Sequence, residues 1–193
     1  MKKMRKKHSK VKVMVSIGML SSIAYLLMVL QFPLPYFPNF LFVDFSDIPA
    51  MLATLIFGPV AGILVELLKN VLDYVATGSQ TGIPVGHIAN FFAGIIFILP
   101  TYLVYTRIKS RKGMTLGLIV GTVIMAVVMS ILNYYVILPA YTALLNMPDM
   151  RSYVIPFILP FNIIKGIMMS IIFMLLFIRM QAWINKFSVV NNA

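Results

Sequence analysis

Long apolar runs alternate with short polar breaks along almost the whole chain. The runs cover residues 11–31, 48–76, 84–107, 114–138 and 156–184. Each run has at least the roughly 20 residues that a helix needs to cross a bilayer. The pattern predicts an all-α, polytopic membrane protein rather than a soluble domain.

The second run is long enough for one very long helix or for two short ones. Phe57-Gly58-Pro59 interrupts it, and proline removes a backbone donor and clashes with the preceding turn. A first helix of about ten residues would cross only about half a bilayer, so it must lie buried or tilted in the bundle. With this division, the expected helices are at about 11–31, 48–57, 59–76, 84–107, 114–138 and 156–184.

The distribution of basic residues favours six spans over five. The chain is 61% hydrophobic and only 11% charged, yet its net charge is +11. Seven of the 16 lysines and arginines lie within the first twelve residues, and the rest include two further groups, at Arg107, Lys109, Arg111 and Lys112 and at Arg179 and Lys186. Six spans place all three groups, and both termini, in the cytoplasm, in agreement with the positive-inside rule. The charge therefore indicates membrane topology and not binding to nucleic acid.

One membrane domain accounts for nearly all of the chain. Residues 1–10 are expected to form a basic cytoplasmic tail that is disordered or lies on anionic lipid, residues 11–187 the six-helix domain, and residues 188–193 a short C-terminal tail. No small-x-small cleavage site follows the first run, which is therefore expected to be retained as a helix in the cell membrane. The chain has no cysteine, so disulfides and thiol chemistry are excluded.

The first loop is unusually aromatic. Residues 32–45 contain six aromatic residues and three prolines, so they cannot form a regular helix. The loop is expected either to cover a pocket or to lie as an aromatic belt at the lipid interface.

Ionisable residues form one stripe on the helix expected at 59–76. Glu66, Lys69, Asn70 and Asp73 share a face, with Tyr74 beside it. Charges at membrane depth are costly, so this face is expected to point into the bundle. Lys69 can reach Glu66 at i−3 and Asp73 at i+4. The stripe is thus either a self-neutralised structural cluster or an electrostatic wall under a pocket.

The last two helices supply further polar groups at similar depth. Asn133 lies on one, and Asn162 and Lys165 lie one turn apart on the other. Lys165 has no acid within reach on its own helix, so it needs a partner from another helix, a ligand oxygen or water. The asparagines, with Asn90 as a weaker candidate, either share a pocket or bridge helices. His87 is expected at the interface, without a metal.

The sequence has no motif for nucleotide hydrolysis or for nucleophilic catalysis. It lacks G-x-x-x-x-G-K-[ST], G-x-G-x-x-G, G-x-S-x-G and H-E-x-x-H. No enzymatic activity is expected, and the residues by themselves indicate only a pocket for an aromatic, hydrogen-bonding small molecule.

Several stretches resemble a known family. Asp44-Phe45-Ser46-Asp47-Ile48-Pro49 and Pro160-Phe161-Asn162-Ile163-Ile164-Lys165-Gly166 are the most specific, and residues 57–62, 66–70 and 130–134 add to them. They resemble the riboflavin-binding (RibU-type) S components of energy-coupling factor (ECF) transporters, over most of the chain.

The resemblance implies a function and a set of site residues. It implies six helices, riboflavin as transported ligand with no cofactor, and a transmembrane T component with two cytoplasmic ATPases as partners. Asp44 and Asp47 are expected at the mouth of a pocket that favours a neutral flavin over a phosphorylated one. A docking face on the first helix is expected at Gly18, Ser21 and Ser22. The candidate ligand-binding residues are Leu41, Phe42, Asp44, Tyr74, Asn90, Asn133, Asn162 and Lys165.

Two alternatives remain open from the sequence. The chain could be an S component for another vitamin, although the aromatic loop and the Asn-x-x-Lys of the last helix favour a flavin. It could also be a stand-alone secondary transporter of a small aromatic solute, in which Glu66, Lys69 and Asp73 form an ion-coupling relay.

Overall fold

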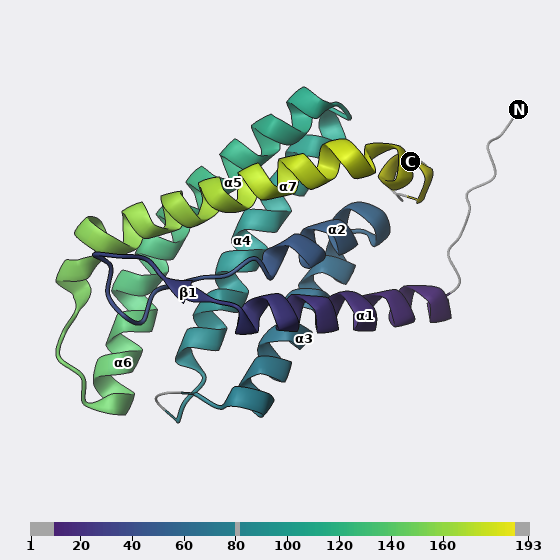
Figure 1. Cartoon of the computed structure of the whole chain (residues 1–193). Helices are drawn as coiled ribbons and strands as arrows, with labels where there is room; N and C mark the ends of the chain where they lie inside the picture. Colours follow the sequence, from purple (N-terminus) through teal and green to yellow (C-terminus); the bar gives the residue numbers. More distant parts are fainter. Residues whose placement is uncertain (1–9, 80–81, 188–193) are drawn as a thin grey trace, which may run out of the picture.

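The computed structural model describes residues 10–79 and 82–187, and almost all of them are helical (Figure 1). The prediction of an all-α protein is confirmed, because the two strands in the described residues form only a short hairpin within the first loop. The elements in chain order are α1 (Lys10–Val29), β1 (Phe32–Pro33), β2 (Phe42–Val43), α2 (Asp47–Phe57), α3 (Pro59–Thr77), α4 (Val85–Arg107), α5 (Arg111–Leu132), α6 (Leu138–Leu145) and α7 (Leu159–Phe187).

Four helical stretches are long and apolar enough to cross a membrane. They are Lys10–Val29, Val85–Arg107, Arg111–Leu144 and Arg151–Gln181. The other two helices of the bundle, α2 and α3, do not meet this criterion, because α2 is short and α3 carries charged residues. α2 has only 11 residues, and the 19 residues of α3 include three charged ones, all buried.

The break between α2 and α3 lies where the sequence predicts it. α2 ends at Phe57, Gly58 has a φ of 99°, and α3 begins with Pro59 at its first position. Glycine tolerates this left-handed backbone, and proline is well suited to the first turn of a helix. Gly62 then lets α3 approach α2, since a Cβ there would lie 3.0 Å from the carbonyl oxygen of Ala50.

The second half of the chain differs from the expected helix ends. After α5, the chain continues through a π turn at Asn133–Ile137 into α6, so helix occupies part of the expected loop at 139–155. A second π turn, Val154–Ile158, leads into α7. Each π turn directly precedes a Leu-Pro pair, Leu138-Pro139 or Leu159-Pro160. Proline disrupts the regular α-helical bonding of the turn before it, and the wider turn lets the helix continue.

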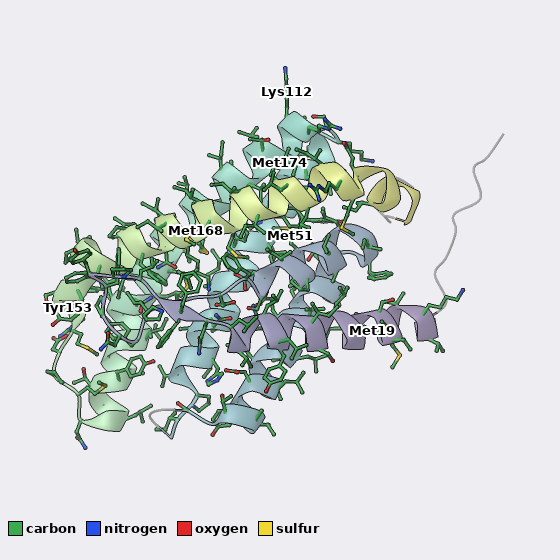
Figure 2. All side chains as sticks on the ribbon, in the orientation of Figure 1. Met19, Met51, Lys112, Tyr153, Met168 and Met174 are labelled. Carbon is green, nitrogen blue, oxygen red and sulfur yellow. The ribbon has the colours of Figure 1, made fainter. Side chains whose placement is uncertain are left out.

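The bundle has two distinct ends (Figure 1). The start of α1, the α4–α5 turn and the end of α7 lie at one end, which we call the basic end. At this end Arg111 Nε donates to Gln181 Oε1 at 2.9 Å, joining α5 to α7. Figure 2 shows Lys112 projecting from the tip of this end. The opposite end, the loop end, carries the first loop, the turn after α3, and α6.

Close packing fills the half of the bundle nearest the basic end. Tyr105 of α4 meets Phe177 of α7 edge to face, with ring centroids 5.5 Å apart. Gly117 and Gly121 of α5 let α4 approach, because a Cβ at Gly117 would lie 2.7 Å from the carbonyl oxygen of Thr101. Gly117 and Gly121, four residues apart, therefore mark a helix contact.

Candidate ligand-binding site

A cavity of about 440 Å³ opens at the loop end, within the volume range of small-molecule sites. The last turn of α1, the first loop, α4, α5 with its π turn, α6 and the start of α7 all contribute to its wall. Of the candidate ligand-binding residues, six line it, namely Leu41, Phe42, Asn90, Asn133, Asn162 and Lys165.

Two buried asparagines present their amides to the cavity in the same way. The Nδ2 atom of Asn133 donates to the carbonyl oxygen of Met129 at 2.8 Å, and that of Asn162 donates to the carbonyl oxygen of Ile158 at 2.8 Å. Each bond to the preceding turn fixes the direction of its amide. Within the described residues, neither amide oxygen accepts a hydrogen bond from the protein. Both oxygens are therefore available to a donor on a ligand.

Lys165 finds its partner in the first loop, and not on another helix as the sequence reasoning had considered. Its Nζ atom lies 2.9 Å from Oδ2 of Asp44, and both side chains are almost fully buried. The same carboxylate oxygen accepts a hydrogen bond from Nδ2 of Asn90 at 3.1 Å. The expectation that Asp44 lies at the mouth of the pocket is wrong. It is 1% exposed and lies behind Lys165 and Asn90 rather than on the cavity wall.

The charged stripe of α3 faces the interior, as predicted, but its pairing differs. Lys69 lies 2.8 Å from Glu66, forms a short contact with Asp47, and donates to Ser46 Oγ at 2.6 Å. Asp47 is therefore buried in this cluster and does not lie at the mouth. The expected pair of Lys69 with Asp73 is absent from the described contacts. Helical side chains lean toward the helix N-terminus, so Lys69 extends toward Glu66 and away from Asp73.

Asp73 pairs instead with His87, and both line the cavity. The Nε2 atom of His87 lies 3.0 Å from Oδ2 of Asp73. The sequence reasoning placed His87 at the interface but did not identify this carboxylate partner. The end of α3 and the start of α4 are joined by a short turn, so two residues 14 apart can meet across it. The short turn between the two helices was the feature of the sequence that could have predicted this pair.

Tyr74 does not reach the cavity. It is 37% exposed and packs edge to face on the ring of His87, at a centroid distance of 5.5 Å. With Leu67 and Phe91 it lines a separate apolar groove between α3 and α4. One residue along a helix is a rotation of about 100°, which takes Tyr74 off the face that carries Asp73.

The first loop lies over the cavity, and this favours the cover over the aromatic belt. Phe40, Leu41 and Phe42 line the cavity directly. Phe37 meets Phe161 of α7 with ring centroids 5.9 Å apart. The sequence reasoning did not single out several other lining residues, most of them apolar residues that give no chemical signal: Met28, Gln31, Met129, Ile137, Tyr141, Met147, Met150 and Phe161.

The expected docking face on α1 is only partly exposed. Gly18 and Ser22 lie on the exposed face, and no atom lies within 4 Å of a Cβ built on Gly18. Met19 projects beside them, away from the bundle (Figure 2). Ser21 is 1% exposed and donates to the carbonyl oxygen of Ile17. Ser21 therefore packs inward and does not belong to that face.

Comparison with known proteins gives the class of this protein. Residues 12–177 match the family described as "ECF transporter, substrate-specific component". The chain therefore belongs to the family of ECF transporter substrate-specific components, which are parts of transporters and not enzymes.

Similar proteins include two with riboflavin in their names. The chain is 50% identical over 182 residues to the riboflavin transporter FmnP of Bacillus subtilis, covering 92% of this chain and 96% of that protein. It is 45% identical over 177 residues to the riboflavin transporter RibU of Staphylococcus aureus, covering 90% and 92%. A solved S component of a bacterial ECF transporter superposes with a TM-score of 0.80 at 46% identity, covering 91% of this chain and 98% of that chain.

Proposed function

We propose that this protein is the riboflavin-binding S component of an ECF transporter in the cell membrane. The observation that carries the proposal is the cavity, which combines an aromatic cover with three asparagine amides and a lysine already neutralised by Asp44. Relatives at 50% and 45% identity are named riboflavin transporters, which supports the same ligand.

Riboflavin matches the chemistry of this wall. Its isoalloxazine ring offers flat faces to aromatic side chains such as Phe42 and Tyr141. Its imide edge carries an N–H between two carbonyl groups, which complements amide side chains such as Asn133 and Asn162. The ribityl hydroxyls can bond to the remaining polar groups of the wall. The ligand is uncharged, as a wall with a paired lysine favours.

The binding experiment is direct. Purified protein should carry or take up riboflavin, giving a yellow preparation with a flavin absorption spectrum and saturable quenching of flavin fluorescence. A colourless protein that does not bind added riboflavin would refute the proposal. Binding of a different vitamin with riboflavin excluded would favour the alternative S component.

The proposed topology has six spans, with the basic end in the cytoplasm and the loop end outside. The basic groups on α1, the α4–α5 turn and α7 support it through the positive-inside rule. A cysteine at Asn146, exposed at the loop end, should react with an impermeant thiol reagent in intact cells. A cysteine at Lys112 should react only after lysis, and the native chain has no cysteine to give background. Labelling of the Lys112 position in intact cells would contradict the topology.

Uptake is proposed to need a T component and two ATPases, since the chain has no nucleotide-binding motif. The exposed face of α1 at Gly18 and Ser22 is the proposed docking surface, because small side chains allow close approach of helices in lipid. Gly18→Trp should abolish uptake and leave riboflavin affinity intact. Ile119→Trp, on the exposed face of α5, serves as the control and should preserve uptake. Riboflavin accumulation by proteoliposomes that hold only this chain and an ion gradient would favour the secondary transporter instead.

A further inference from the structure

The cavity wall carries few charged residues. Among the described residues that line it, Lys165 is the one lysine or arginine. Its ammonium lies 2.9 Å from the carboxylate of Asp44. The other ionisable groups of the wall are Asp73 and His87, which pair with one another. The wall therefore offers no uncompensated positive charge to a ligand.

Asp44 compensates the positive charge of the wall, although its own side chain does not line the cavity. Its Oδ2 atom accepts from Lys165 at 2.9 Å and from Asn90 at 3.1 Å, and both donors line the cavity. Its Oδ1 atom accepts from the backbone N–H of Ser46 at 3.0 Å and from the Ser46 hydroxyl. Both oxygens are thus occupied by the protein. Asp44 therefore has no oxygen left to bond a ligand, and it acts on one through the two donors that it holds and through its negative charge.

The pairing has a consequence for anionic ligands. A phosphate that enters the cavity must shed strong hydration, and it gains little from an ammonium that already has a carboxylate partner. The carboxylates of Asp44 and Asp73 also repel it. Without Asp44, the same lysine would attract the phosphate.

We propose that Asp44 sets the charge selectivity of the cavity, so that removal of its charge shifts preference from neutral riboflavin toward phosphorylated flavins. The proposal rests on the proposed function and assigns Asp44 a role through its charge, which neutralises Lys165 and repels an anion in the cavity. A purely structural role, as an anchor of the first loop, would weaken binding of both flavins alike. The ratio of the two dissociation constants therefore separates selectivity from anchoring.

The test compares riboflavin with flavin mononucleotide, which differs by one phosphate. Asp44→Asn keeps the size of the side chain and removes its charge. The ratio Kd(flavin mononucleotide)/Kd(riboflavin) should fall by about tenfold relative to the wild type, as expected for one uncompensated charge near the ligand. Asp149→Asn makes the same chemical change at an exposed site of the loop end and should leave the ratio unchanged.

A second pair of variants isolates the same charge if Asp44→Asn does not fold. Lys165→Met and the double variant Asp44→Asn/Lys165→Met differ only in the charge of residue 44. The ratio should be higher in the single variant, where the carboxylate has lost its lysine, than in the double variant, where both charges are gone. The double variant should also be the more stable of the two, because it leaves no unpaired buried charge.

The outcomes are distinct. A wild-type protein that binds neither flavin would overturn the proposed function together with this inference. Riboflavin binding by the wild type, with the same ratio in Asp44→Asn and in the wild type, would overturn the charge selectivity alone. Equal ratios in Lys165→Met and the double variant would also overturn it.

Discussion

The two halves of the bundle are built from the same helices but are filled differently. Near the basic end, α4, α5 and α7 meet through glycines and through the rings of Tyr105, Phe173 and Phe177, which leave almost no exposed surface. Near the loop end, the continuations of these helices surround a cavity of about 440 Å³. The packed half fixes the positions of the helices, and the hollow half can then hold polar groups apart for a ligand.

The two π turns belong to the hollow half. Asn133 begins one, and its carbonyl oxygen accepts from the N–H of Leu138 five residues on. The other ends at Ile158, whose carbonyl oxygen receives the amide of Asn162. A π turn inserts an extra residue into a helix and often marks a functional site. These turns therefore place the two cavity asparagines, and an unbroken α-helix would set them at other angles.

The largest expected effect comes from the ionic cluster on α3. Lys69→Met removes a fully buried ammonium and leaves Asp47 and Glu66 without their cation. The free energy of unfolding should fall by about 3–5 kcal/mol, the usual cost of breaking a buried ion pair from one side. Thermal unfolding in detergent measures it. Lys112→Met, at the exposed tip of the basic end, is the matched control and should leave the melting temperature unchanged.

A slightly smaller effect tests the packed half. Phe177→Ala opens a cavity between Tyr105 and Phe173 and should cost about 3 kcal/mol of stability. Riboflavin affinity should stay unchanged at a temperature where the variant is folded, because the change lies in the other half of the bundle. Leu175→Ala, on the exposed face of α7, should alter neither quantity. A loss of affinity in Phe177→Ala would break the division between the two halves.

Substitutions in the hollow half should change riboflavin affinity and leave stability nearly unchanged. Asn133→Ala or Asn162→Ala should weaken riboflavin binding by about 1–3 kcal/mol, because a polar group of the bound ligand loses its partner. The melting temperature without ligand should change little, since each amide oxygen accepts no hydrogen bond within the described residues. Titration calorimetry and thermal unfolding of the same samples give both values. Unchanged affinity in both variants would show that neither asparagine bonds the ligand.

The smallest effect is expected at the exposed pair of Asp149 and Arg151. Hydrogen bonds from the Arg151 side chain and backbone, and its positive charge, hold the pKa of Asp149 below its ordinary value of 3.8. A lowered pKa in the folded state stabilises the protein above the ordinary pKa, and this contribution is lost as the pH falls through the lowered value. Asp149→Asn should barely change the melting temperature at neutral pH, since the pair is exposed. Any difference in melting temperature between Asp149→Asn and the wild type should vanish in acid. A difference that grows in acid would contradict the lowered pKa of Asp149.

Local signals in the sequence predicted much of the fold and part of the site. Gly58 and Pro59 fixed the division of α2 from α3, because their backbone preferences act on neighbouring residues. Helical periodicity placed Glu66, Lys69 and Asp73 on an inward face, and Asn133 and Asn162 emerged as polar residues at membrane depth. Each inference needed only residues within a few turns.

Long-range pairings could not be predicted in the same way. Asp44 and Lys165 are 121 residues apart, and their contact depends on how the first loop folds back over α7. The helix end expected at residue 138 was also wrong, because a π turn before Pro139 lets helix continue to Leu145. The sequence shows that Lys165 needs a partner, but the tertiary fold decides which acid supplies it.

The order of residues along the chain gives this pairing a consequence for assembly. Lys69 follows Ser46 and Asp47 by 23 and 22 residues, so α2 and α3 can neutralise their own charges as one hairpin soon after they leave the ribosome. Asp44 belongs to the same early segment, but its lysine lies on α7, 121 residues further along the chain. The link that ties the first loop to α7 therefore forms only after α7 has been synthesised. A chain that stops short of α7 keeps a carboxylate without its lysine.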